Sequence, residues 1–430
     1  MEQITKPHCG ARLDRLPDCR WHSSMFAIVA FGLLVCWSNA VGGLILAQLK
    51  ALGWTDNSTT ATFSAITTAG MFLGALVGGI IGDKTGRRNA FILYEAIHIA
   101  SMVVGAFSPN MDFLIACRFV MGVGLGALLV TLFAGFTEYM PGRNRGTWSS
   151  RVSFIGNWSY PLCSLIAMGL TPLISAEWNW RVQLLIPAIL SLIATALAWR
   201  YFPESPRWLE SRGRYQEAEK VMRSIEEGVI RQTGKPLPPV VIADDGKAPQ
   251  AVPYSALLTR VLLKRVILGS CVLIAMNVVQ YTLINWLPTI FMTQGINLKD
   301  SIVLNTMSMF GAPFGIFIAM LVMDKIPRKT MGVGLLILIA VLGYIYSLQT
   351  SMLLITLIGF FLITFVYMYV CYASAVYVPE IWPTEAKLRG SGLANAVGRI
   401  SGIAAPYAVA VLLSSYGVTG VFILLGAVSI

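Results

Sequence analysis

Carboxylates and arginines recur at matching positions in the two halves of this chain of 430 residues. Asp83 is followed four residues later by Arg87, and the pattern recurs as Asp324 and Arg328, at an offset of 241 residues. A glutamate followed by a proline and then by an Arg-Gly pair also occurs once in each half. Opposite charges at helix ends can form ion pairs that one conformation makes and another breaks. The repeats therefore indicate an internal duplication and a conformational switch.

A second set of ionisable residues lies inside apolar stretches, namely Glu95, His98, Arg118 and Arg399. An ionisable group in hydrocarbon is costly, so each is a functional candidate by default. Glu95 and His98 are three residues apart, on one helix face, and histidine titrates near neutral pH, so the pair is a candidate for proton coupling. A purely structural bond between them or to a neighbour is the alternative. Arg399 either joins an ion pair in helix packing or docks an anionic substrate.

These residues need helices in a membrane to position them, because the chain is 56% hydrophobic and only 12% charged. Soluble domains carry about 25% charged residues, so the composition excludes a water-soluble enzyme, a secreted disulfide scaffold and a disordered chain. A span needs about 20 apolar residues, and eleven stretches are long enough: 24–47, 62–82, 89–109, 113–137, 150–173, 182–202, 263–290, 301–323, 331–348, 352–378 and 392–415. For the shorter twelfth stretch, 417–430, we expect that the chain continues beyond Ile430; a short last helix is the alternative.

The placement of the basic residues predicts the orientation. Of the 32 lysines and arginines, 26 fall on one side of the predicted spans, which by the positive-inside rule is the cytoplasm. The net charge of +11 therefore reports topology and indicates anionic lipid neighbours, not a nucleic-acid partner. A sequon in a short outer loop argues for a bacterial inner membrane. The seven cysteines form no CxxC pair, and we expect no metal site or disulfide among them.

A polar break separates the apolar stretches into two groups. We expect an N-terminal six-helix bundle over 1–202, a cytoplasmic central loop over 203–259 and a C-terminal bundle over 260–430. Two parallel six-helix repeats are one architecture of secondary transporters.

Several motifs resemble those of the major facilitator superfamily. The segment from Gly74 to Arg88 is similar to its signature between helices 2 and 3, and Arg118-x3-Gly122-x3-Gly126 resembles its helix 4 signature. Pro203-Glu-Ser-Pro-Arg-Trp-Leu209 is similar to the sugar porters within it. Leu13-Asp-Arg-Leu-Pro17, Trp286-Leu-Pro288 and Gly398-Arg399 look more like a neighbouring branch that carries small organic acids and other metabolites with protons.

The resemblance implies an all-α membrane protein with a twelve-helix fold of two six-helix pseudo-repeats. It also implies a cytoplasmic gate formed by the charged repeats: Asp83, Gly86, Arg87, Arg88, Glu138, Arg145, Asp324, Arg328, Glu380 and Arg389. Pro327 stands where the first repeat has Gly86, so the second turn is expected to be more rigid.

Proton-coupled sugar porters pair an acid of helix 1 with the helix 4 arginine, and here Ser38 or Asn39 stands where that acid would be. Neither can carry a proton. The solute is expected to contact polar and aromatic residues in the middle of the spans, whereas a bond to a neighbouring helix is the alternative for each. The candidates are Ser38, Asn39, Arg118, Asn157, Gln280, Tyr281, Asn285, Trp286, Tyr372 and Arg399.

The function expected is secondary transport of a sugar, polyol or organic acid across the cytoplasmic membrane, by proton-coupled uptake and alternating access. The alternatives are an uncoupled facilitator of the same solutes and a transporter-like sensor that does not translocate. We expect a monomer that needs no cofactor, because no nucleotide-binding Gly-x4-Gly-Lys-Ser/Thr loop occurs in the chain. A membrane enzyme is disfavoured, because one intramembrane glutamate and one histidine supply neither a metal set nor a triad.

Overall fold

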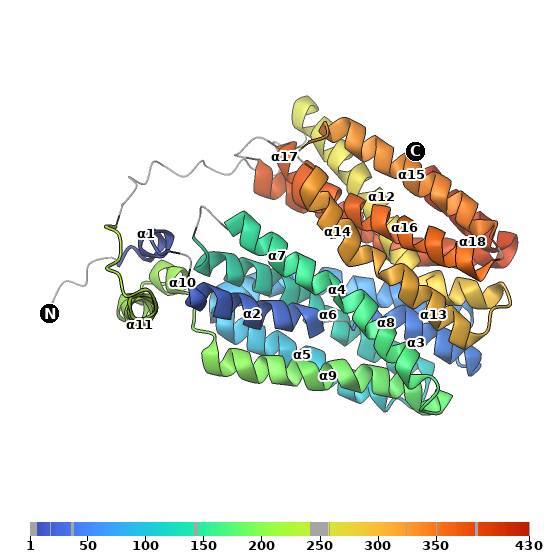
Figure 1. Cartoon of the computed structure of the whole chain (residues 1–430), viewed down its shortest axis with the longest axis horizontal. Helices are drawn as coiled ribbons and strands as arrows, with labels where there is room; N and C mark the ends of the chain where they lie inside the picture. The colour runs from blue at the N-terminus through green and yellow to red at the C-terminus, as the bar shows by residue number, and fades with distance from the viewer. Residues whose placement is uncertain are drawn as a thin grey trace.

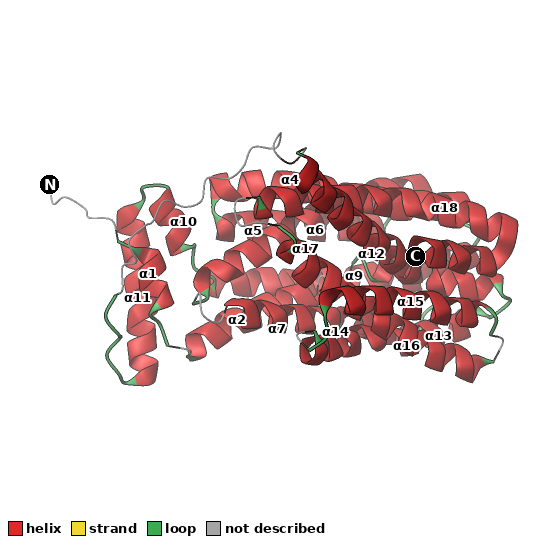
Figure 2. Ribbon diagram, turned by 90° about the horizontal axis from the view of Figure 1, so that it is seen from above, coloured by secondary structure: helices red, strands yellow, loops and turns green. Residues whose placement is uncertain are grey.

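The computed structural model describes residues 7–17, 19–35, 38–141, 145–240, 257, 259–323, 325–349, 351–382 and 386–429. These residues form helices and connecting loops, with no strand among them (Figure 2). The first half contains α2 (Arg20–Val35), α3 (Val41–Ala51), α4 (Asn57–Thr85), α5 (Arg87–Ala106), α6 (Met111–Tyr139), α7 (Arg145–Asn157), α8 (Ser159–Leu170) and α9 (Ala176–Tyr201).

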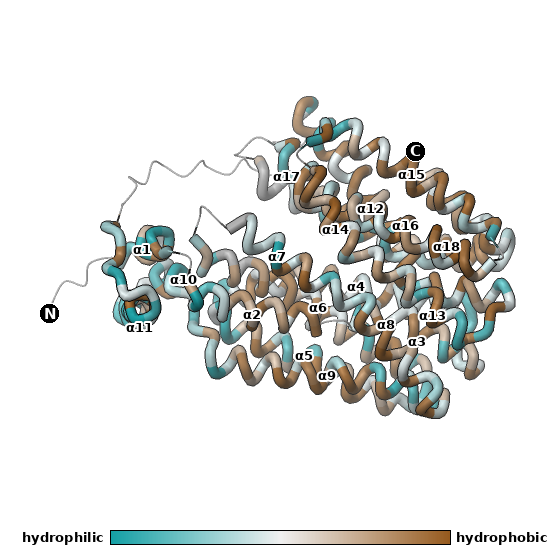
Figure 3. The backbone as a smooth tube through the Cα atoms, viewed as in Figure 1, coloured by the Kyte–Doolittle hydropathy of each residue, from teal (hydrophilic) through white to brown (hydrophobic). Residues whose placement is uncertain are grey.

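The second half contains α12 (Arg260–Thr293), α13 (Leu298–Met309), α14 (Gly311–Val322), α15 (Arg328–Ser347), α16 (Met352–Cys371), the π-helix η2 (Tyr372–Tyr377), α17 (Val378–Glu380) and α18 (Lys387–Ser429). Outside the bundle lie α1 (Cys9–Asp14), α10 (Pro206–Ser211) and α11 (Tyr215–Thr233). These three are mostly hydrophilic, whereas the bundle helices are mostly hydrophobic (Figure 3). We call the end of the bundle that carries them the basic end, and the other end the opposite end.

Nine helices among the described residues are long and apolar enough to cross a membrane. The predicted stretch 24–47 corresponds to two shorter apolar helices, α2 and α3, and the stretch 150–173 to α7 and α8. The predicted boundary between 392–415 and 417–430 falls inside α18 at Gly417, where a φ of 66° interrupts the helix. The count of twelve spans stays a prediction.

Glycines bring α4 and α6 into close contact. A Cβ atom at Gly74 would collide with the backbone of Val123, and one at Gly126 with the backbone of Met71. Small residues at such positions let membrane helices approach until their backbones touch. The apolar sequence of α4 therefore also specifies which of its faces packs against α6.

The two halves are joined toward the opposite end. There α3 contacts α12, and α8 contacts α13, while the halves diverge toward the basic end (Figure 1). Asn305 of α13 donates a hydrogen bond of 3.1 Å to Ser164 of α8, and Asn57 donates one of 3.0 Å to Ser414. A Cβ atom at Gly43 of α3 would collide with the α12 backbone, so this contact is especially close.

The Gly74→Ala variant is expected to lower the thermal stability of the protein in detergent, because the added methyl group meets the Val123 backbone. Overpacking of this kind costs about 1–3 kcal/mol. The control is Gly79→Ala on the same helix, where nothing lies within 4 Å of the new Cβ atom. Equal apparent melting temperatures for the two variants would contradict the close packing of α4 on α6.

Candidate functional site

The break between α2 and α3 brings Ser38 against two ionisable side chains. Ser38 is fully buried, and its Oγ lies 2.7 Å from Nε2 of His98 on α5. Its carbonyl oxygen accepts a hydrogen bond of 2.7 Å from Nη1 of Arg118 on α6. A discontinuous helix leaves backbone groups free to bind ions or neighbouring side chains in transporters. The predicted spans 24–47, 89–109 and 113–137 therefore meet at this one buried residue.

Arg118 is 2% exposed and is held by neutral partners. Its Nε donates to Thr67 Oγ1 at 3.3 Å, and its guanidinium lies over the Phe63 ring at 4.6 Å. Among the residues that the structure describes, no carboxylate forms an ion pair with it. A Cβ atom at Gly42 would lie 2.6 Å from Nη2, so a side chain there would displace this guanidinium.

Glu95 and His98 are both 0% exposed, and Oε2 of the glutamate lies 3.5 Å from Nδ1 of the histidine. The other ring nitrogen faces Ser38, so the imidazole lies between a carboxylate and a hydroxyl, and its hydrogen bond is to the hydroxyl. A Cβ atom at Gly124 would lie 3.0 Å from the His98 backbone nitrogen, which shows how tightly α6 packs there. Within the described ranges, no three His, Cys, Asp or Glu side chains are grouped as metal ligands would be.

The second half contributes polar and aromatic residues from α12. The Oδ1 atom of Asn285 lies 3.6 Å from the Cβ position of Gly42, next to Arg118. Tyr281 is 8% exposed and packs against Gly402 of α18. These predicted residues are therefore gathered at the contact between the halves.

Two tyrosines that the sequence analysis did not select lie between the halves. Tyr160 of α8 and Tyr367 of α16 form an edge contact with ring centroids 5.4 Å apart, and Gln280 lies close to Tyr367. No charge or motif marks either tyrosine in the sequence; the only available signal was an aromatic residue in the middle of a span.

Three predicted residues have local partners or a packing role. The side chain of Asn157 donates to the Ser153 carbonyl in its own helix, and the carbonyl of Asn39 accepts from the Gly42 amide. Trp286 is 0% exposed in a hydrophobic cluster of α4, α12 and α18. Neither Asn157 nor Trp286 bonds a neighbouring helix through its side chain among the described residues, so their contact with solute stays a prediction.

Tyr372 and Arg399 lie apart from this group. Tyr372 begins η2 near Arg328 and Glu380, and its ring is stacked between Tyr369 and Tyr377. Arg399 is half-buried on α18 and forms no hydrogen bond or ion pair with the described residues. The ion-pair alternative for Arg399 therefore has no partner in the described part of the chain.

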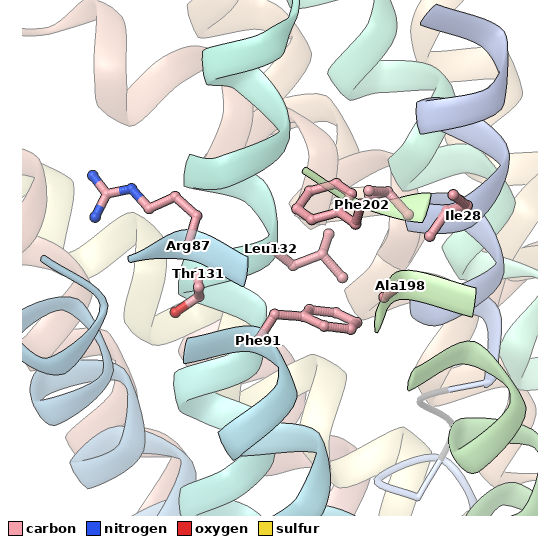
Figure 4. Close-up of a pocket in the computed structure, with 8 residues that line it drawn as sticks. Ile28, Arg87, Phe91, Thr131, Leu132, Ala198 and Phe202 are labelled. Carbon is pink, nitrogen blue, oxygen red and sulfur yellow. The ribbon is translucent and has the colours of Figure 1, made fainter. Parts of the chain in front are cut away.

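A small apolar cavity lies within the first half, near its basic end. Ile28, Phe91, Leu132 and Phe202 point into it, whereas the guanidinium of Arg87 points away (Figure 4). Thr131 supplies the one hydroxyl in the lining. The cavity lies inside one half and offers a single hydroxyl, so it does not resemble a site for a polar solute.

The first charged repeat is assembled around Arg87. Its guanidinium forms ion pairs of 2.7 Å with Asp83 and 2.8 Å with Glu138, so α4, α5 and α6 are joined at the basic end. The backbone φ of Gly86, at 96°, suits only glycine. Arg88 donates instead to the Trp199 carbonyl of α9.

The segment after α9 docks on this repeat. Glu204 accepts hydrogen bonds from the backbone amides of Arg87 and Arg88 at 2.7 and 3.2 Å, at the start of α5. Ser205 donates to Glu138, and the indole of Trp208 donates to the Asp83 carbonyl at 2.7 Å. This Pro-Glu-Ser-Pro segment carries the resemblance to sugar porters, but its glutamate was not among the predicted gate residues.

In the second repeat, Arg328 forms an ion pair of 3.0 Å with Glu380. Asp324 lies outside the described residues, as do the side chains of Arg145 and Arg389. Pro327 precedes α15 and has a φ of −55°. At the corresponding position of the first repeat, Gly86 has a positive φ of 96°. The pairs formed by Arg87 and Arg328 thus each join helices of a single half.

The outer helices α1, α10 and α11 form a small assembly with its own apolar core and ion pairs. Glu226 of α11 accepts from Arg12 and Arg15, both at 2.7 Å, and is 12% exposed. Burial alone would raise the pKa of Glu226, but the two arginines hold it below its usual 4.5. Burial, helped by Glu210, raises the pKa of the Cys9 thiol to about 12.

Residues 26–406 match the family model described as Major Facilitator Superfamily. The chain is 44% identical over 429 residues to the inner membrane metabolite transport protein YdjE of Escherichia coli (strain K12), covering 99% of this chain and 94% of that protein. It is 30% identical to the putative metabolite transport protein YyaJ of Bacillus subtilis (strain 168), with coverage of 99% and 94%. A partially occluded inward-open structure of the xylose transporter XylE from E. coli has a TM-score of 0.73 at 17% identity, covering 95% and 96%. The predicted family resemblance and fold are confirmed.

Cys9 is buried where α1 docks on α11, and Glu226 holds that contact through Arg12 and Arg15. The Glu226→Gln variant is expected to weaken the docking and so speed alkylation of Cys9 about tenfold, because losing a charge-assisted hydrogen bond costs about 1.5–3 kcal/mol. The measurement is maleimide labelling of the full chain with its other cysteines replaced. The lowered pKa of Glu226 also means that this docking is complete above pH 4.5 and weakens as the pH falls through the lower folded value.

Glu227→Gln is the matched control, since this neighbour on α11 is exposed. Equal labelling rates in both variants would contradict docking of α1 through Glu226.

Proposed function

Because the chain belongs to the Major Facilitator Superfamily, we propose that it carries a small polar metabolite, a sugar, polyol or organic acid, through the membrane by alternating access. The proposal rests on one observation. The two halves touch toward the opposite end and diverge toward the basic end, and polar side chains of both halves meet between these ends (Figure 1). Such an arrangement can rock about a central site.

The basic end is proposed to face the cytoplasm of a bacterium, in the inner membrane, with the N-terminus on that side. The excess of lysine and arginine near this end supports it. The solute would then be released to the cytoplasm from the present conformation. The proposed domains, 1–202, 203–259 and 260–430, correspond to two moving halves and the segment that links them.

The charged repeats are proposed to form the cytoplasmic gate. Arg87 with Asp83 and Glu138, and Arg328 with Glu380, fix helix ends within each half at the end where the halves diverge. Rocking would bring these two clusters toward each other. Ion pairs exchanged between the clusters would stabilise the alternate state and keep the two states within a few kcal/mol.

Arg118 and Arg399 favour an organic acid over a neutral sugar as the solute, because each lacks a carboxylate partner among the described residues. A carboxylate would supply the missing countercharge. Proton-coupled uptake is proposed as the energy source. The neutral Ser38 at the expected acid position keeps an uncoupled facilitator as the second candidate.

The test of transport is exchange of radiolabelled nicotinate, myo-inositol and D-xylose by purified protein in vesicles. Saturable exchange of at least one probe, blocked by an excess of the same unlabelled compound, is the expected result. Binding without exchange across the panel would favour a solute sensor and contradict the proposal.

The Asp83→Asn variant is expected to abolish uptake while the protein remains in the membrane, because the neutral amide no longer pairs with Arg87. The measurement is initial uptake normalised to the amount of protein. Asp112→Asn makes the same change at an exposed position of α6 near the opposite end and is expected to transport normally. Near-normal uptake by Asp83→Asn would reject the gate.

A further inference from the structure

We propose that Glu95 and His98 together form the proton-binding site of this transporter, connected through Ser38 and Arg118 to the contact between its halves. The inference rests on the proposed transport function and specifies how it is coupled. Glu95 and His98 are 0% exposed and 3.5 Å apart, and His98 lies 2.7 Å from Ser38. Ser38 stands where an acid was expected in the first span. The pair on α5 supplies a carboxylate instead, and its imidazole contacts Ser38.

Because the pair is buried, the gain or loss of one proton changes the electrostatic energy of the groups around it. Without that proton the pair carries the single negative charge of the carboxylate, and with it the pair is neutral overall. A change of charge in a site with no exposed surface has a large energetic effect on its neighbours, because water does not screen it.

The groups around the pair explain how a negative charge is tolerated there. From α6 comes Arg118, whose charge is opposite; α5 itself adds Tyr94, whose hydroxyl donates to the Gly78 carbonyl. The buried polar side chains of α9 are neutral amides and hydroxyls: Asn179, Gln183 and Ser191. Those of α4 are hydroxyls: Thr60, Ser64, Thr67 and Thr68.

Protonation reverses a hydrogen bond at the helix break. With Nδ1–H directed at Glu95, the neutral imidazole accepts at Nε2 from the Ser38 hydroxyl. When the ring takes up a proton from the aqueous phase, Nε2–H becomes the donor, and the hydroxyl hydrogen must turn to another acceptor. The Ser38 carbonyl is at the same time the acceptor for Arg118.

This break is connected to the contact between the halves. Four residues after Ser38, Gly42 lies against the guanidinium of Arg118, and Gly43 lies against the α12 backbone at Ile284 and Asn285. The contacts therefore run without interruption from His98 to the second half. A change at Ser38 can alter how α3 holds α12 at the end where the halves are joined.

The first experiment needs no solute. Infrared difference spectra of purified protein are recorded during a pH titration, and we expect bands of one carboxyl group or imidazole ring that Glu95→Gln and His98→Gln both remove or displace. Ser101→Ala is the control, since its hydroxyl donates to the His98 carbonyl on the same helix and has no other hydrogen bond to a described residue. Titrations of both variants that superimpose on that of the parent protein would overturn the proposal.

The second experiment separates coupling from transport in vesicles, using whichever of the three probes exchanges fastest. His98→Gln and Glu95→Gln are expected to keep solute exchange near the parent rate while accumulation driven by a pH gradient falls by about tenfold, a usual size for such coupling. Ser38→Ala is expected to retain the infrared titration but lose accumulation.

Undiminished accumulation by His98→Gln would overturn the proton site. A parent protein that exchanges solute but never accumulates it under a pH gradient would also overturn the site and leave a facilitator. If the parent protein exchanges no probe, the proposed transport function fails together with the coupling.

Discussion

The buried guanidinium of Arg118 is the constraint on which the centre of this protein depends. A cation that is 2% exposed inside a membrane bundle must be stabilised by its surroundings. Here the stabilisation comes from the Ser38 carbonyl, the Thr67 hydroxyl and the Phe63 ring. The interruption between α2 and α3 supplies that carbonyl, and Gly42 supplies the space beside the charge. Removing any one of the three partners would leave the arginine charge with less stabilisation.

The same constraint connects the central site to the charged repeats. Close glycine packing of α4 on α6 fixes Thr67 and Phe63 against Arg118, and the basic ends of these two helices are joined by Arg87. Glu204 and Trp208 then attach the outer helices to that end. A displacement of α6 would therefore move both Arg118, which bonds Ser38, and Glu138, which pairs with Arg87 in the first charged repeat. Rigid helices that join two sites in this way are the physical means by which binding at one changes the other.

The sequence predicted much of the fold, because spans, basic loops and repeated charges are local properties of the chain. It also identified the residues that pair with Arg87. It did not predict that His98 contacts Ser38, because this contact depends on the rotation of α5 relative to the break in helix 1. The buried face of α5 carries Glu95 and His98 toward Ser38. Tyr160 and Tyr367 were missed for a similar reason, since only the docking of the halves brings them together.

The central claim is that the charge state near Ser38 controls which end of the bundle is closed. The most direct measurement is the distance between spin labels at Lys84 and Lys329, exposed positions near the basic ends of the two halves, in protein without other cysteines. Two distance populations whose ratio changes with pH are predicted for this protein, and a ratio that no longer responds is predicted for Ser38→Ala. A pH response of equal size in both proteins, or none in the parent, would contradict the account.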